Sequence, residues 1–152
     1  MGRLIIDTSG YLAGTAAKHP LSEVIQGILR TVTEPPVVSP LVLAEIDYMV
    51  LGRVGVDQEL AVIDDLTSGA YEIADLDVDD LRTARGLAAQ HRDLKIGITD
   101  ALNAVLADRY DTNEILTTDQ RHFRAVTPLS RRFDAFRLLP ADRSIAPSAR
   151  NG

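Results

Sequence analysis

Residues 4–10 read Leu-Ile-Ile-Asp-Thr-Ser-Gly, an apolar run that stops abruptly at an acidic residue. A short, continuous apolar run bounded by turn residues is typical of a buried strand. We therefore expect a strand over residues 3–6, followed by a turn at residues 7–10. Similar short runs predict further strands over residues 35–38, 71–74, 114–117 and 136–139.

Helical patterns separate these strands. Apolar residues recur at helical spacing over residues 21–32, 40–51, 57–67, 78–90 and 99–109. Ser39 and Pro40 suit the N-cap and first turn of the second helix, Gly52 its end, and Thr99 the cap of the last. Strands joined through helices predict an α/β fold with a mainly parallel sheet of four or five strands, covered by helices on both faces.

Length and composition limit the organisation of the chain. It has 152 residues, of which 45% are hydrophobic, so we expect one domain over residues 1–140 and a flexible tail over 141–152. No stretch reaches the roughly 18 apolar residues of a membrane span, and we expect a cytoplasmic protein. Without cysteine there is no disulfide or thiolate zinc site, and the three histidines form no pair at metal-ligand helical spacing.

The net charge of −6 is unevenly distributed. Residues 121–152 carry seven Arg against two Asp, so the acidic excess lies in the preceding part of the chain. An acidic body beside an arginine-rich segment can hold cations in one place and phosphates next to them. The alternative is a solvated face with a charged tail.

Four carboxylates stand out, and a parallel sheet would place two of them, Asp7 and Asp119, at the same edge. Asp7 and Asp119 follow predicted strands, Asp100 lies in the first turn of a helix, and Glu45 borders the apolar stripe of another. Ligands of open parallel sheets bind at the carboxyl ends of the strands. Clustered carboxylates repel one another unless a cation neutralises them, and an oxygen-only ligand set suits Mg²⁺ or Mn²⁺. Taken singly, the three aspartates are also ordinary helix caps or turn residues.

Residues 4–9, 39–45, 98–104 and 115–123, in this order, resemble the PIN domain family, and within it the VapC-type toxins of bacterial toxin–antitoxin pairs. The resemblance extends over residues 4–140. It implies a metal-dependent ribonuclease with a PIN-like fold, in which Asp7 and Asp100 are the principal metal ligands and Glu45 and Asp119 complete the site.

The resemblance also implies roles for neighbouring residues. The hydroxyls of Ser9 and of Thr117 or Thr118 are expected to orient Asp7, and Asn103 is expected to assist through water. Arg121 and Arg124 would contact the RNA backbone.

The expected partners are an RNA substrate, a cognate antitoxin and a second copy of the chain. Two alternatives remain open: an RNA-processing nuclease without an antitoxin, and a binding module whose acidic pocket engages a protein.

Overall fold

The computed structural model describes residues 2–144, and its five short strands form one sheet in which every neighbouring pair is parallel. The strands are β1 (Ile5–Ile6), β2 (Val37–Val38), β3 (Glu72–Ile73), β4 (Glu114–Leu116) and β5 (Arg137–Leu139). Their spatial order, β3-β2-β1-β4-β5, makes β1 the central strand. The carboxyl end of β1 therefore lies between the carboxyl ends of β2 and β4.

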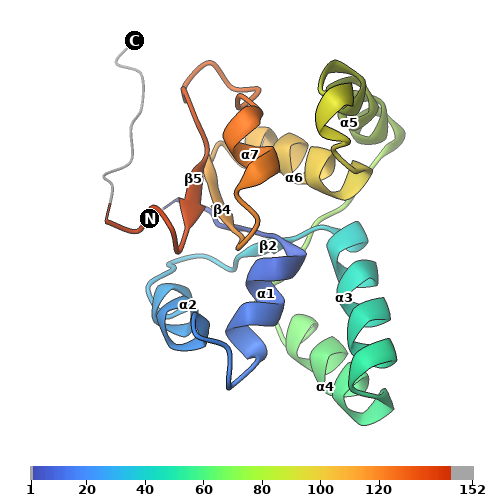
Figure 1. The fold of residues 1–152 in the computed structure, drawn as a ribbon, viewed down its shortest axis with the longest axis vertical. Helices are drawn as coiled ribbons and strands as arrows, with labels where there is room; N and C mark the ends of the chain where they lie inside the picture. The colour runs from blue at the N-terminus through green and yellow to red at the C-terminus, as the bar shows by residue number, and fades with distance from the viewer. Residues whose placement is uncertain (1, 145–152) are drawn as a thin grey trace.

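Helices cover both faces of this sheet (Figure 1). On one face lie α1 (Thr8–Thr15), α2 (Ser22–Leu29), α3 (Pro40–Arg53) and α4 (Val56–Leu66). On the other lie α5 (Val78–Gln90), α6 (Ile98–Arg109) and α7 (Arg121–Ala125), with the short 3-10 helix η1 (Arg92–Leu94) between α5 and α6. The predicted α/β class with a parallel sheet covered on both faces is confirmed.

Alternation along each strand divides the core into two layers. Ile5 packs with the α5 and α6 side, whereas Ile6 packs with the α1 to α4 side. The same division separates Ile115 from Leu116 and Leu138 from Leu139. Because successive side chains of a strand point to opposite faces, strands of two or three residues suffice to supply both layers.

The prediction of a turn at residues 7–10 is wrong, because α1 begins at Thr8, shortly after the end of β1. Gly10, interpreted as a turn residue, is buried within this helix. A Cβ atom there would lie 2.3 Å from the carbonyl oxygen of Leu116. The glycine therefore permits close packing of α1 against β4 and does not mark a break in the chain.

Several predicted boundaries also shift. Helix α3 passes through Gly52 and ends at Arg53, α6 begins at Ile98 with Gly97 as its N-cap, and α7 is a helix that the pattern did not reveal. Within residues 2–144, no helix combines the length and apolar character needed to cross a membrane.

Packing continues beyond the predicted domain boundary at residue 140. Asp142 is buried and accepts a hydrogen bond of 2.9 Å from the backbone nitrogen of Leu138. Residues 141–144, the first of the predicted tail, form a turn. The rest of the predicted tail, residues 145–152, lies outside the described residues.

We predict that Gly10→Ala lowers the free energy of unfolding by about 1–3 kcal/mol, because the new methyl group forces the backbone of α1 away from β4. The matched control is Gly86→Ala in α5, where nothing lies within 4 Å of the new Cβ atom. That change should stabilise the helix by about 0.5–1 kcal/mol. Urea unfolding measures both, and equal stabilisation by the two changes would contradict the close packing of α1.

Candidate metal-dependent nuclease site

The four predicted carboxylates meet at one cleft. Asp7 follows β1, Asp119 follows β4, Asp100 lies in the first turn of α6, and Glu45 lies in α3; all four line a cavity of about 310 Å³. Parallel pairing of β1 with β4 brings the segments after these strands together. The structure thus assembles, from four separate segments, the set of acids that the sequence predicts.

Asp7 is the most enclosed of these acids, with 5% of its surface exposed. Its Oδ1 atom accepts a hydrogen bond of 3.1 Å from Asn103 Nδ2. Its Oδ2 atom accepts bonds from Thr117 Oγ1 at 2.8 Å and Ser9 Oγ at 3.2 Å. Three neighbours therefore fix the direction of the carboxylate, and Asn103 contacts it directly, whereas the sequence suggested contact through water.

Thr118 has a different position from Thr117. Its backbone nitrogen donates a 3.0 Å hydrogen bond to Ser9 Oγ, and its side chain is exposed. Thr118 therefore reaches Asp7 only through Ser9, by a backbone group that any residue other than proline supplies.

Burial and the nearby Asp100 charge raise the pKa of Asp7 to about 6, although hydrogen bonds from Thr117 and Ser9 act in the opposite direction. The pKa of Asp100 is also raised by burial, and a hydrogen bond from His122 opposes that rise. Both carboxylates are thus held where their negative charge is unfavourable. A cation bound between them would relieve this cost.

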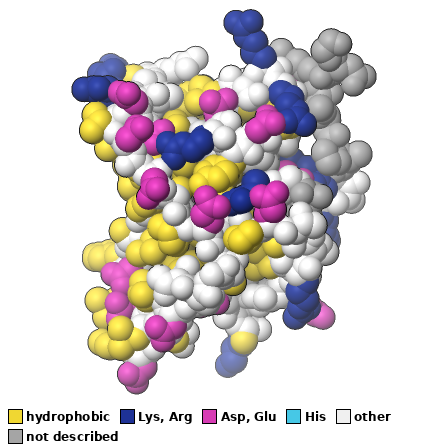
Figure 2. Space-filling view, turned by 180° about the vertical axis from the view of Figure 1, so that it is seen from behind, with side chains coloured by type: hydrophobic (Ala, Val, Ile, Leu, Met, Phe, Trp, Pro, Cys, Tyr) yellow, Lys and Arg dark blue, Asp and Glu magenta, His cyan; other side chains and the backbone are white. Residues whose placement is uncertain are grey.

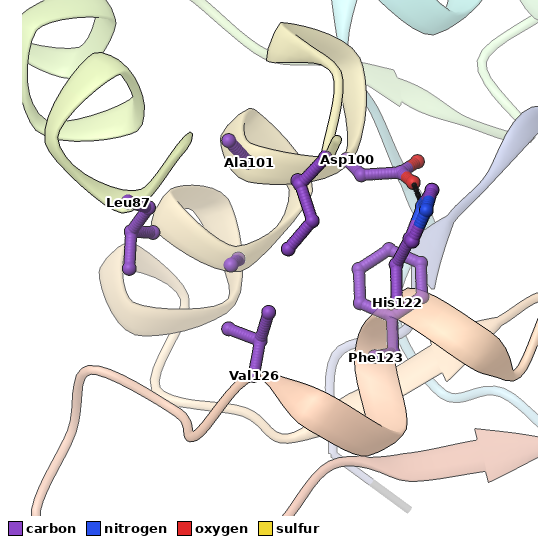
Figure 3. Close-up of a pocket in the computed structure, with 8 residues that line it drawn as sticks. Leu87, Asp100, Ala101, His122, Phe123 and Val126 are labelled. Carbon is purple, nitrogen blue, oxygen red and sulfur yellow. Dashed lines mark hydrogen bonds and ion pairs between the residues drawn. The ribbon is translucent and has the colours of Figure 1, made fainter. Parts of the chain in front are cut away.

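His122 is the residue that sequence reasoning missed. Its Nδ1 atom lies 2.6 Å from Asp100 Oδ2, and Figure 3 shows the two side chains, from α7 and α6, pointing toward one another. His122 lies within residues 115–123, one of the segments that resemble the PIN domain family. It was not identified from the sequence, because only pairs of histidines at metal-ligand spacing were considered there. Asp100, Asp119 and His122 each offer a ligand atom within 4.8 Å of the others.

Asp119 and Glu45 form the open side of the cleft, since both side chains are exposed. Asp119 Oδ1 accepts a 3.1 Å bond from the backbone nitrogen of Arg121, and so caps the start of α7. Although Glu45 borders the apolar stripe of α3, its side chain is in contact with solvent. Its carboxylate can therefore reach an ion without a desolvation penalty of its own.

The two predicted RNA-binding arginines differ in their surroundings. Arg124 donates to both carboxylate oxygens of Asp142, at 2.6 and 2.7 Å, and to Gln120. Arg121 is exposed, and only its backbone nitrogen takes part in the hydrogen bonds around Asp119.

The donor set fits a hard divalent cation. Carboxylate oxygens from Asp7, Glu45, Asp100 and Asp119 are the ligands that Mg²⁺ and Mn²⁺ prefer. Two further oxygens, Thr8 Oγ1 and Asn103 Oδ1, are buried without a hydrogen-bond partner within residues 2–144. Buried oxygens of this kind are costly, and Thr8, which lines the cleft, makes it still more favourable for positive charge.

The profile of the PIN domain matches residues 4–128, and the chain belongs to the PIN domain family. It is 45% identical to Ribonuclease VapC26 of Mycobacterium tuberculosis over 126 residues, which are 83% of this chain and 93% of that protein.

Two solved structures share the fold. The crystal structure of VapC20 from Mycobacterium tuberculosis, described as a sarcin-ricin-loop-cleaving toxin, superposes with a TM-score of 0.70 at 16% identity. That match covers 77% of this chain and 90% of VapC20. DNA-bound VapBC from Salmonella typhimurium gives a TM-score of 0.56 at 21% identity, over 70% of this chain and 80% of the matched one.

We predict that Asp7→Asn stabilises the metal-free protein. The folded protein keeps the Asp7 proton up to about pH 6, whereas the unfolded chain releases it near pH 3.8. The folded state therefore binds more protons in this interval, and the free energy of unfolding falls as pH rises through it. At pH 7.5 the neutral asparagine should raise the free energy of unfolding by about 1–3 kcal/mol.

Urea unfolding in EDTA between pH 4 and 8 measures this effect, with Asp79→Asn on the exposed face of α5 as the control. Millimolar Mg²⁺ should stabilise the wild type and not the Asp7→Asn variant, because only the wild type binds the ion well. A variant less stable than the wild type at pH 7.5 in EDTA would contradict the prediction.

Proposed function

We propose that this protein is an endoribonuclease that hydrolyses RNA phosphodiester bonds with Mg²⁺ or Mn²⁺ held by Asp7, Glu45, Asp100 and Asp119, and that it is the toxin of a type II toxin–antitoxin system. The observation that carries the proposal is the convergence of these four carboxylates in one cleft. The similarity to Ribonuclease VapC26 supports RNA as the substrate.

The residues of the cleft perform distinct parts of this chemistry. A bound divalent cation supplies the positive charge that stabilises the phosphate in the transition state and activates water. Asp7, held by Ser9, Asn103 and Thr117, provides a fixed anionic anchor for the ion. The exposed Glu45 and Asp119 leave the cleft open to a polymeric substrate. The proposed hydrolysis needs no side-chain nucleophile, and its products are a 5′-phosphate and a 3′-hydroxyl.

An antitoxin partner is supported by the surface beside the cleft. Leu12 and Met49 line the acidic cavity and also a neighbouring groove of about 330 Å³ between α1, α3 and α4. One segment of a partner could therefore place an arginine among the carboxylates and apolar side chains in the groove. Such a contact would inhibit the nuclease directly, and it favours the toxin over an RNA-processing enzyme without an antitoxin.

Further apolar surface is exposed at the end of the molecule formed by α3 and α4. Figure 2 shows hydrophobic and acidic side chains gathered there, at the lower left, and Tyr48, Val54 and Val56 are at least 58% exposed. Exposed apolar patches of this kind mark protein contacts. We include a homodimer in the proposal on this basis, and we place the protein in the cytoplasm with its RNA substrate.

Arg121 is the arginine that we assign to RNA binding. Its side chain is exposed, and its backbone nitrogen donates to Asp119, which lines the cleft. The Arg124 guanidinium is paired with Asp142, and we assign it a structural role instead.

The proposal predicts that Asp7→Asn and Asp100→Asn each abolish Mg²⁺- or Mn²⁺-dependent RNA cleavage while the protein stays folded. Each change removes a negative charge from the metal site, and the hydroxyls of Ser9 and Thr117 can reverse to accept from an asparagine amide at position 7. Cleavage of total cellular RNA by the purified proteins, with circular dichroism as the folding control, measures this. Asp79→Asn should retain full activity, and undiminished cleavage by both site variants would reject the mechanism.

Arg121→Ala and Arg124→Ala should separate binding from stability. Arg121→Ala should weaken RNA binding and reduce the slope of log affinity against log salt by about one. Arg124→Ala should lower the free energy of unfolding by about 1–2 kcal/mol, because Asp142 stays buried without its ion pair. Fluorescence anisotropy with RNA and urea unfolding distinguish the two, and the opposite assignment of effects would show that Arg124 is the phosphate contact.

A further inference from the structure

The His122 ring occupies a place in the site that the four carboxylates do not explain. It approaches Asp100 Oδ2 through Nδ1, at 2.6 Å, and both side chains are about one-fifth exposed. An ionised carboxylate only accepts hydrogen bonds, so Nδ1 carries the hydrogen and donates it. A nitrogen that donates to Asp100 has no lone pair left for a cation, so only Nε2 keeps one in the neutral ring.

The short helix α7 holds this ring firmly in position. Phe123 is 2% exposed and packs edge-to-face against Phe136, with the ring centroids 5.9 Å apart. The capping bond from the Arg121 nitrogen to Asp119 fixes the start of the helix, and Arg124 ties its other end to Asp142. The position of His122 is therefore set by contacts that do not involve Asp100.

One side of the ring faces a small apolar cavity. His122 lines a small cavity together with Leu87, Phe123 and Val126, as Figure 3 shows. The remaining Asp100 oxygen, Oδ1, has no hydrogen-bond partner within the described residues. One oxygen of Asp100 is thus held by His122, and the other remains available for an ion.

We propose that His122 is a positioning residue of the metal site: its Nδ1–H holds Asp100 Oδ2, directs the carboxylate into the cleft and raises the affinity for the cation without binding the cation itself. The inference rests on the proposed metal site and adds to it a residue outside the four acids. It follows the general pattern in which a hydrogen-bond partner orients a ligating carboxylate.

Three variants test this role through Mn²⁺ affinity, measured by calorimetry without RNA. His122→Phe keeps a ring in the apolar cavity but removes the donor, and should weaken Mn²⁺ binding about 10–100-fold. His122→Gln keeps a polar side chain but carries its amide beyond the Nδ1 position, so it should weaken Mn²⁺ binding to a similar extent. His122→Asn places an amide N–H near the Nδ1 position and should retain most of the affinity.

His91→Phe, after the end of α5, is the matched control and should bind Mn²⁺ as the wild type does. Thermal unfolding in EDTA establishes that each variant is folded. Unchanged Mn²⁺ affinity in the Phe and Gln variants, or failure of Asn to retain it, would overturn the proposal.

Pulsed electron paramagnetic resonance of the Mn²⁺-loaded wild type tests whether the histidine is itself a ligand. We expect no coupling from a directly coordinated ¹⁴N nucleus, and such a coupling that disappears in His122→Gln would overturn the positioning role.

RNA cleavage is assayed in parallel. A wild type that binds Mn²⁺ but cuts no RNA would reject the proposed function alone, whereas normal cleavage with unchanged Mn²⁺ affinity in the Phe and Gln variants would reject this inference alone.

Discussion

The hydroxyl group of Thr117 joins the two strands on which the site depends. It donates to Asp7 Oδ2 at 2.8 Å and accepts from the backbone nitrogen of Asp119 at 3.0 Å. Thr117 itself is fully buried. A buried hydrogen bond to a charged group contributes about 1.5–3 kcal/mol. Through one side chain, the end of β4 therefore fixes both the acid that follows β1 and the loop that carries the fourth acid.

This arrangement has an electrostatic cost in the absence of a cation. Asp7 is almost wholly enclosed and Asp100 partly so, and burial raises the pKa of both carboxyl groups. Hydrogen bonds from Ser9, Thr117 and His122 reduce the cost without removing it. The fold thus keeps negative charge in an unfavourable place. Binding of a divalent cation would offset this electrostatic cost and stabilise the folded state.

Two sets of packing contacts hold the helices that carry or adjoin the acids in fixed positions. Gly10 lets α1 approach the Leu116 carbonyl group, so Asp7 leaves β1 directly into a helix with no flexible turn between them. On the opposite face of the sheet, the Phe123–Phe136 contact and the Arg124–Asp142 ion pair hold α7 against the segments on either side of β5. The contacts that hold α7 in place therefore extend to Asp142, in the turn after β5.

The sequence by itself determined the parallel α/β architecture, because strand and helix patterns are read from neighbouring residues. It also predicted the four candidate acids, since Asp7, Asp100 and Asp119 stand next to recognisable strand or helix ends. It did not reveal α1 or α7, because Gly10 looks like a turn until Leu116 is beside it and α7 is too short to show a period. Nor did it indicate that Arg124 pairs with Asp142, that Asn103 contacts Asp7 directly, or that His122 meets Asp100. These pairings join residues 18 to 96 positions apart, and only the folded chain brings their atoms within hydrogen-bonding distance.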